Sequence, residues 1–232
     1  MTDARYGRWF RAAGVLALLY AALVLLGGVL SLAGVTGDVY DPARGTAARL
    51  FAVYASRAAA LAARVGVVGV FLLAAALPAF ALRLARRTPA LAWSGLGLAA
   101  LSLTLRLVAS LFQLAAFGFA NGSSPALLAS VPAGDLTLLF DQLAGALSLP
   151  ATLAGAVWFI LWGFAFLGGE RRTDRVAGAA LLATVAAGGA TYAAFAAHAP
   201  LGAYAGIAAQ TLAEATAFGF AGLSLLSSPP PE

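Results

Sequence analysis

The sequence predicts an all-α polytopic membrane protein, a six-transmembrane-helix bundle with both termini cytoplasmic. The first observation is composition: of the 232 residues, 62% are hydrophobic and only 10% are charged, whereas a soluble domain carries about 25% charged residues. The second is that six apolar segments each reach the roughly 20 residues needed to cross a bilayer as a helix. The third is the distribution of arginine: most arginines lie before the first segment and in every second connection between segments.

The first predicted span covers about residues 12–35 and follows three arginines, Arg5, Arg8 and Arg11. A basic start followed by small residues at 31–33 is also typical of a secretory signal peptide. The apolar run, however, is longer than the roughly 7–15 residues of such a signal. We therefore interpret this segment as a span that is retained.

The first connection, about residues 36–57, is too short to hold a soluble domain, so residues 1–232 are predicted to form a single membrane domain. In its second half, apolar residues recur at helical spacing with arginines between them. This pattern is typical of an interfacial helix along the outer membrane surface; alternatively, it lengthens the second span, predicted over about 58–84.

The four remaining spans are predicted over about 90–119, 136–167, 176–197 and 201–226. The segment at 136–167 is long enough to tilt or break, and Pro150 marks the expected kink because proline removes a helical hydrogen bond. All of these stretches are long and rich in leucine and alanine. That composition favours helices over the short alternating strands of a membrane β-barrel.

Arginine sets the predicted orientation, because positively charged connections stay on the cytoplasmic side. The arginines before the first span and in the second and fourth connections are Arg5, Arg8, Arg11, Arg83, Arg86, Arg87, Arg171, Arg172 and Arg175. The first outer connection is the exception, with Arg44, Arg49, Arg57 and, at its end, Arg64. Trp9 and Trp93 fall at the inner interface and Tyr54 near the outer one, as in an aromatic belt. The net charge of +5 is thus an orientation signal, and no nucleic-acid partner is predicted.

Several chemistries are excluded by the residue types themselves. The chain has no cysteine, so disulfides, thiolate metal sites and cysteine nucleophiles cannot form. It has no lysine to carry a Schiff-base cofactor, and its single histidine, His198, excludes a haem held by two of its own histidines. No metal-binding or catalytic spacing occurs in the sequence. We therefore predict that the chain is not an enzyme and that it has no catalytic residue, metal or cofactor.

Arg106 is the first of two ionisable residues inside predicted spans, where a charge is costly and therefore points to a functional role. It lies in the outer half of the third span. Ser102, Ser110 and Gln113 share one helical face with it, because their positions repeat at helical spacing. The sequence therefore predicts a polar stripe that faces the interior of the bundle.

Glu214 is the second such residue and lies near the middle of the sixth span, with Gln210 one turn earlier. Its height is close to that of Arg106, so we expect a charge-assisted pair between the two side chains. Asp141 and His198 share the outer half of the membrane. The sequence thus predicts an outward-opening polar pocket, with a set of candidate ligand-binding residues: Arg64, Arg106, Gln113, Gln210 and Glu214.

Each of these features also has a purely structural interpretation. The buried pair can fix helix register without any ligand. Arg64, Asp141 and His198 can be interfacial residues whose polar ends reach headgroup water. Trp158 and Trp162, one turn apart in the fourth span, either stack on a ligand, pack against other residues or face lipid headgroups.

Several short motifs carry a resemblance to a known family: Arg11-Ala12-Ala13-Gly14, Arg64-Val65-Gly66, Arg106-Leu107-Val108, the aromatic run 158–163 and Arg175-Val176-Ala177-Gly178. In these features the chain resembles a family of bacterial six-helix integral membrane proteins that is known only as a domain of unknown function. A His-Gly pair of the fourth span in that family is missing here, where Ala144-Gly145 or Leu149-Pro150 stand. The resemblance implies the same architecture and gives weight to Arg64 and Arg106, but it implies no activity.

Together these observations favour an integral membrane protein that binds or passes a small solute or a lipid headgroup at the outer-half polar pocket. In this hypothesis Arg64 and Arg106 hold a small anionic solute or group, and Glu214 balances Arg106. The alternative is a structural or partner-binding membrane subunit without a ligand, whose partner is another membrane protein or, in a homo-oligomer, a second copy. Both hypotheses place a multi-pass protein among the lipids of the bacterial inner (cytoplasmic) membrane.

Overall fold

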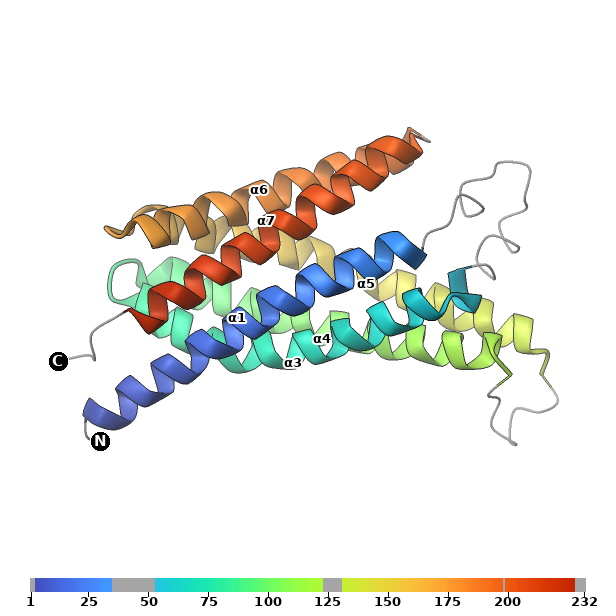
Figure 1. The fold of residues 1–232 in the computed structure, drawn as a ribbon, viewed down its shortest axis with the longest axis horizontal. Coiled ribbons are helices and arrows are strands. Elements are labelled where there is room, and N and C mark those ends of the chain that lie inside the picture. Colours follow the sequence, from blue (N-terminus) through green and yellow to red (C-terminus); the bar gives the residue numbers. More distant parts are fainter. Residues whose placement is uncertain (1–2, 35–52, 123–130, 198, 228–232) are drawn as a thin grey trace.

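The computed structural model describes residues 3–34, 53–122, 131–197 and 199–227. Regular structure in these ranges is helical, as the sequence predicts. The long helices are α1 Asp3–Gly34, α3 Arg57–Ala85, α4 Pro89–Ala120, α5 Ala133–Leu167, α6 Arg172–Ala196 and α7 Pro200–Leu226. Figure 1 shows that they run along the length of the molecule in alternating directions.

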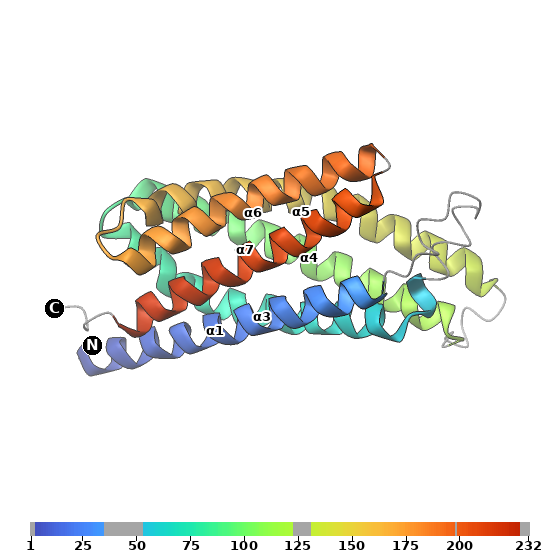
Figure 2. The ribbon, with the colours of Figure 1, turned by 45° about the horizontal axis from the view of Figure 1, so that its top comes forward.

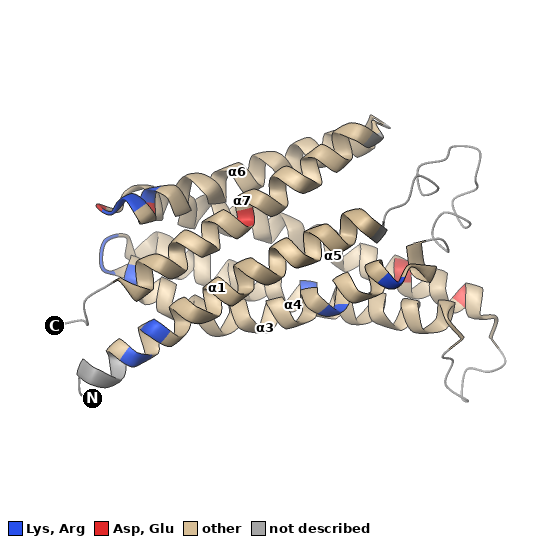
Figure 3. Ribbon diagram, in the orientation of Figure 1, with Lys and Arg blue, Asp and Glu red and all other residues tan. Residues whose placement is uncertain are grey.

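The helices form a closed ring. Each long helix contacts the next one along the chain, and α7 returns to contact α1. Figures 1 and 2 show this arrangement from two sides. α1 begins and α7 ends at the same end of the ring, where Figure 3 also shows arginines of α1, of the turn after α3 and of the start of α6. We call this the arginine-rich end, and the opposite end the far end.

Five of these helices are long and apolar enough to cross a membrane: α1 over Gly7–Ala33, and α3, α4, α5 and α6 over their full lengths. The chain is therefore a multi-helix protein of the polytopic membrane type. α7 has 27 residues and packs along α1 and α6, but it is not among the five candidate spans found in the described residues. The predicted sixth span is thus present as a helix.

Two predictions about helix bounds fall on α5 and on the segment before α3. α5 continues as one helix through Pro150, so the break that the length of this segment allowed does not occur. The interfacial helix predicted within 36–57 lies mostly outside the described residues. Within its described part, residues 53–55 form a helical turn, and α3 begins at Arg57, where Ser56 caps it by accepting a hydrogen bond from the Ala59 N–H at 3.3 Å.

Aromatic side chains fill the axis of the ring in the half near the arginine-rich end. Phe80 of α3 lies 6.2 Å from the rings of both Trp162 and Phe166 of α5, and 6.5 Å from that of Phe218 of α7. Trp158 joins this cluster, 6.0 Å from Phe218. Because α3, α5 and α7 alternate around the ring, contacts among them must cross its axis. We call these five residues the aromatic plug.

Trp158 and Trp162 therefore pack inside the bundle rather than offering a surface to a ligand. Their exposed fractions are 2% and 0%. The indole N–H of Trp162 donates to the Ala92 carbonyl at 3.2 Å, which satisfies the one polar group of a buried tryptophan. Of the interpretations of this pair, the burial of both rings supports packing.

Candidate functional site

A cleft occupies the other half of the ring, between the aromatic plug and the far end. Its inner cavity has a volume of about 330 Å³ and an adjoining outer cavity about 450 Å³. The two share several lining residues, so they are parts of one cleft: Ser31, Ala62, Gly66, Ser110 and Gln113. The polar residues of the inner cavity include Tyr20, Arg106, Ser148, Thr152 and Glu214. We call the whole space the far cleft.

Arg106 lies in the inner cavity, where α4 approaches α5. A methyl group placed on Gly155 of α5 would stand 3.1 Å from both Arg106 Nη2 and Ser102 Oγ. Ser102 is fully buried and donates to the Ala151 carbonyl of α5 at 2.8 Å. Ser102 therefore holds α4 to α5 through its hydrogen bond. Gly155 of α5 leaves room for the guanidinium of Arg106.

Glu214 lies in the same cavity but bonds to a residue that the sequence did not single out. The Tyr20 hydroxyl donates to Glu214 Oε1 at 2.5 Å. Tyr20 and Glu214 are 7% and 8% exposed, respectively. The Tyr20 ring also packs edge-on against Phe218 of the aromatic plug, with centroids 5.0 Å apart. Tyr20 therefore forms the boundary between the far cleft and the plug.

The direct pair predicted between Arg106 and Glu214 is not found. Both residues line the inner cavity, but among the described residues Arg106 has no carboxylate within ion-pair distance and Glu214 accepts only from Tyr20. The reason lies in the ring: α4 and α7 are not neighbours within it, and Tyr20 of α1 reaches the carboxylate first.

The outer cavity ends at a second tyrosine–carboxylate bond. The Tyr54 hydroxyl donates to Asp141 Oδ1 at 2.5 Å, and the Tyr54 carbonyl accepts from the Asn121 side chain at 3.1 Å. The Tyr54 ring packs 4.7 Å from that of Phe117 and is only 4% exposed. Burial first, then the hydrogen bond and charge of Asp141, raise the pKa of Tyr54 well above its ordinary value. Tyr54 is therefore a buried residue of the far cleft and not part of an exposed aromatic belt.

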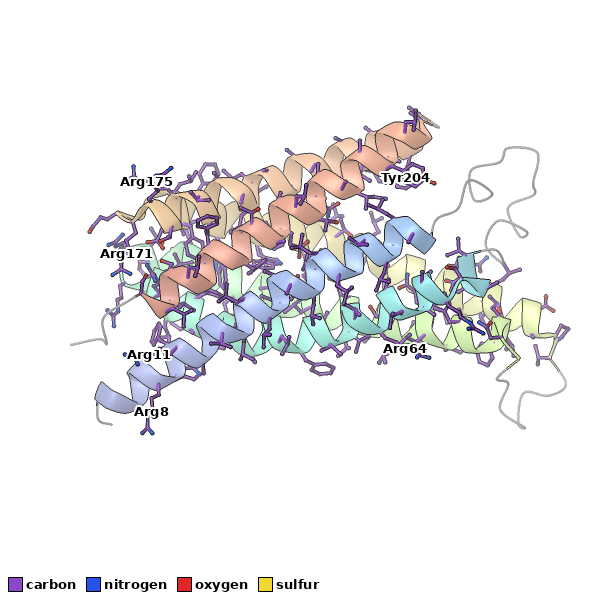
Figure 4. All side chains as sticks on the ribbon, in the orientation of Figure 1. Arg8, Arg11, Arg64, Arg171, Arg175 and Tyr204 are labelled. Atoms are coloured by element: carbon purple, nitrogen blue, oxygen red, sulfur yellow. The ribbon has the colours of Figure 1, made fainter. Side chains whose placement is uncertain are left out.

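Two of the predicted ligand-binding residues lie elsewhere. Arg64 is exposed, lies on the outside of the bundle in Figure 4 and lines neither cavity. Gln210 also lines neither cavity, because its amide turns toward α6, where Gly188 leaves space for it. Gln113 lines both cavities, and His198 lies outside the described residues. The structure thus brings together Arg106, Gln113 and Glu214 but neither Arg64 nor Gln210.

A second polar cluster lies at the arginine-rich end and was missed at the level of sequence. Arg83 of α3 forms an ion pair with Asp174 of α6, Nη2 to Oδ1 at 2.9 Å and to Oδ2 at 3.0 Å. Arg83 also donates to the Ser224 carbonyl of α7, and the Ser224 hydroxyl donates to Asp174. We call these residues the basal network. A signal for it in the sequence was the acidic residue Asp174, which stands among the arginines at the start of α6.

Side chains suited to a metal ion do not gather anywhere in the described ranges, where no three His, Cys, Asp or Glu residues form a group. Comparison with protein-family models, curated proteins and solved structures gave no match. The family resemblance of the short motifs therefore extends only to a multi-helix membrane architecture.

Proposed function

We propose that this protein is a six-span membrane protein that binds a small solute or lipid headgroup in the far cleft, through an anionic group held by Arg106. The proposal includes α7 as the sixth span, because it runs antiparallel to α6 and closes the ring. It also places the arginine-rich end and both termini in the cytoplasm of a bacterial cell, following the positive-inside rule. The far cleft then opens outward.

The observation that carries the proposal is the guanidinium of Arg106, which faces a cavity with no carboxylate bonded to it among the described residues. A charge at membrane depth is costly, and a costly charge is retained where it does something. The nearest carboxylate in the cavity is held by Tyr20 instead. Arg106 therefore has its planar set of donors available to a carboxylate, sulfonate or phosphate oxygen.

The rest of the inner cavity suits a small polar guest. Ser110, Gln113 and Thr152 line it with hydroxyl and amide groups, while Leu103 and Val70 supply apolar walls. A volume of about 330 Å³ lies at the lower end of ligand pockets. We propose a binding or transport role, because these groups can hold a ligand through hydrogen bonds and apolar contacts.

The test is thermal unfolding of the purified protein in detergent, with small carboxylates, sulfonates and phosphate as probes. A probe at about 100 times its Kd should stabilise by about 2.7 kcal/mol, which is roughly 5–10 °C for a chain of this size. Arg106→Gln should abolish the shift while the unliganded protein still unfolds cooperatively. The matched control is Arg64→Gln, since Arg64 is exposed and outside both cavities.

Two outcomes contradict the proposal. The first is that no anionic probe stabilises the wild-type protein; the second is that Arg106→Gln responds as the wild type does. Either result leaves the structural alternative, a membrane subunit whose partner is another protein or a second copy. That alternative predicts a stoichiometric partner or oligomer that survives Arg106→Leu combined with Glu214→Leu.

A further inference from the structure

We propose that the ligand of the far cleft is zwitterionic, with its anionic end at Arg106 and its cationic end at Glu214. This inference rests on the proposed function and adds the chemical class of the ligand. It starts from the arrangement of opposite charges in one cavity, where the guanidinium comes from α4 and the carboxylate from α7. In the described part of the chain, the Arg106 guanidinium and the Glu214 carboxylate form no ion pair with each other.

The Tyr20–Glu214 hydrogen bond leaves one of the two oxygens of the Glu214 carboxylate without a donor among the described residues. An ionised carboxylate only accepts hydrogen bonds and has room for several donors. Tyr20 occupies Oε1, and Oε2 accepts from no described residue. An ammonium group supplies the donors that this second oxygen lacks.

Charge balance favours a zwitterion over a simple anion. Arg106 and Glu214 together give the inner cavity no net charge, and the aromatic plug and apolar helix surfaces around it form a medium of low polarity. A lone anion would leave the occupied cavity with a net negative charge in that medium, which is unfavourable. A zwitterion keeps the sum at zero and places each of its charges beside the opposite charge of the protein.

The size of the cleft limits the ligand further. The volume of the inner cavity, about 330 Å³, lies at the lower end of ligand pockets, so the charged part of the ligand is compact. The outer cavity continues from it toward Tyr54 and Phe117 and can hold an attached apolar part. Two sources share this chemistry: a free amino-acid-like solute and the headgroup of a zwitterionic lipid.

The experiment uses ω-amino acids with two to six carbons, from glycine to 6-aminohexanoate, each matched with the carboxylate and the amine of the same length. Thermal shifts are measured for the wild type, Glu214→Gln and a control, Glu170→Gln, whose carboxylate is 86% exposed at the arginine-rich end. We expect at least one amino acid to bind wild type and control at least tenfold more tightly than its matched carboxylate. Glu214→Gln should bind the amino acid no more tightly than its matched carboxylate, and its thermal shift with the carboxylate should stay that of the wild type.

A second variant keeps the test decisive if Glu214→Gln does not fold. Glu214→Asp retains the charge but withdraws it by one carbon, so the preferred amino acid should become one carbon longer. An unchanged length preference overturns the inference. So does equal binding of amino acids and carboxylates by the wild type, in which case the proposed anion site still stands. If no anion or amino acid binds at all, the proposed function itself fails.

The lipid source is distinguished by reconstitution into nanodiscs of phosphatidylethanolamine or phosphatidylglycerol. A zwitterionic headgroup in the cleft predicts a higher Tm in phosphatidylethanolamine for the wild type, a difference that Glu214→Gln removes. A free solute predicts equal Tm in the two lipids and the same amino-acid shift in both. A phosphatidylethanolamine effect that persists in Glu214→Gln overturns the lipid form of the inference.

Discussion

At the residue scale, burial separates two arginine–carboxylate pairs at the arginine-rich end. The side chains of Arg83 and Asp174 are 16% and 6% exposed, whereas those of Arg87 and Glu170 are 47% and 86% exposed, at nearly the same N–O distance of 2.9 and 3.0 Å. A solvated pair contributes little, because water screens it. A buried pair whose partner is removed leaves an uncompensated charge, which is far more costly. The two pairs should therefore respond very differently to the same substitution.

The first prediction compares Asp174→Asn with Glu170→Gln. Asp174→Asn removes the partner of a largely buried guanidinium and should destabilise the fold by about 3 kcal/mol or more. Glu170→Gln should cost at most about 1 kcal/mol. Chemical denaturation in detergent measures both. Equal effects of the two substitutions would mean that the basal network does not stabilise the closed ring.

The second prediction concerns alkaline pH and Tyr54. The folded protein holds the pKa of Tyr54 above its ordinary value of 10.0, so this residue binds its proton more tightly in the folded than in the unfolded state. Its contribution is fully present below about pH 10 and is lost as the pH rises beyond it. Tyr54→Phe should therefore weaken the loss of stability between about pH 10 and 12. Tyr192→Phe, which alters a tyrosine that is 72% exposed, should keep the wild-type slope; a wild-type slope in Tyr54→Phe would contradict the assignment.

Part of the candidate site could be predicted from the sequence. Arg106 and Glu214 stand out because charges inside apolar segments are rare, and Gln113 follows from helical spacing. Tyr20 could not be singled out, since a tyrosine in an apolar span is equally consistent with packing. Gln210 shares a helical face with Glu214, but a face is wide enough for its side chain to turn to α6 instead.

At the scale of the elements, two glycines set the approach of α5 and α6. A methyl group on Gly178 would stand 2.6 Å from the Gly163 carbonyl oxygen and 2.7 Å from the Leu167 nitrogen. These are backbone atoms, which cannot rotate away. A methyl group on Gly14 of α1 would likewise stand 2.9 Å from the Gly222 carbonyl of α7. The glycines of the two Arg-x-x-Gly sequences, Gly14 in α1 and Gly178 in α6, thus have a physical role in close helix packing.

The third prediction follows from this contact. Gly178→Ala should push α5 and α6 apart and cost about 1–3 kcal/mol, the usual penalty for overpacking. The control is Gly97→Ala, because Gly97 lies on α4 where an added methyl group meets nothing within 4 Å. There the higher helix propensity of alanine should leave stability unchanged or raise it by up to about 1 kcal/mol. A similar loss for both variants would show that the close contact is not the cause.

The helices themselves could be predicted because length and apolarity identify a span without knowledge of its neighbours. Their order around the ring could not. In helices such as α5 and α6, leucine, alanine and glycine occur on every face, so the sequence does not mark which face meets another helix. One consequence concerns the far cleft. The sequence prediction placed Arg64 in it, but Arg64 is exposed on the outside of α3. Tyr20, which the sequence did not single out, lines the inner cavity.

At the scale of the whole molecule, the ring is open in one half and closed in the other. Polar residues of α1, α4, α5 and α7 line the far cleft, whereas the aromatic plug fills the axis and the basal network joins α3, α6 and α7 behind it. A solute that enters from the far end therefore meets a closed floor at Tyr20. Such a shape suits a receptor, or one state of a transporter whose plug must separate before anything passes.

The fourth prediction tests this asymmetry, and the absence of native cysteine makes it direct. Gly66 of α3 lines both cavities, and a side chain there meets nothing within 4 Å, so Gly66→Cys should react with a membrane-impermeant thiol reagent. Under the proposed orientation, intact cells should be labelled from outside. The control, Ala76→Cys, lies three turns along the same helix at a fully buried position and should stay unlabelled from either side. Labelling of Gly66→Cys only in inverted vesicles would reverse the orientation, and labelling of Ala76→Cys in the folded protein would mean that the plug does not seal the ring.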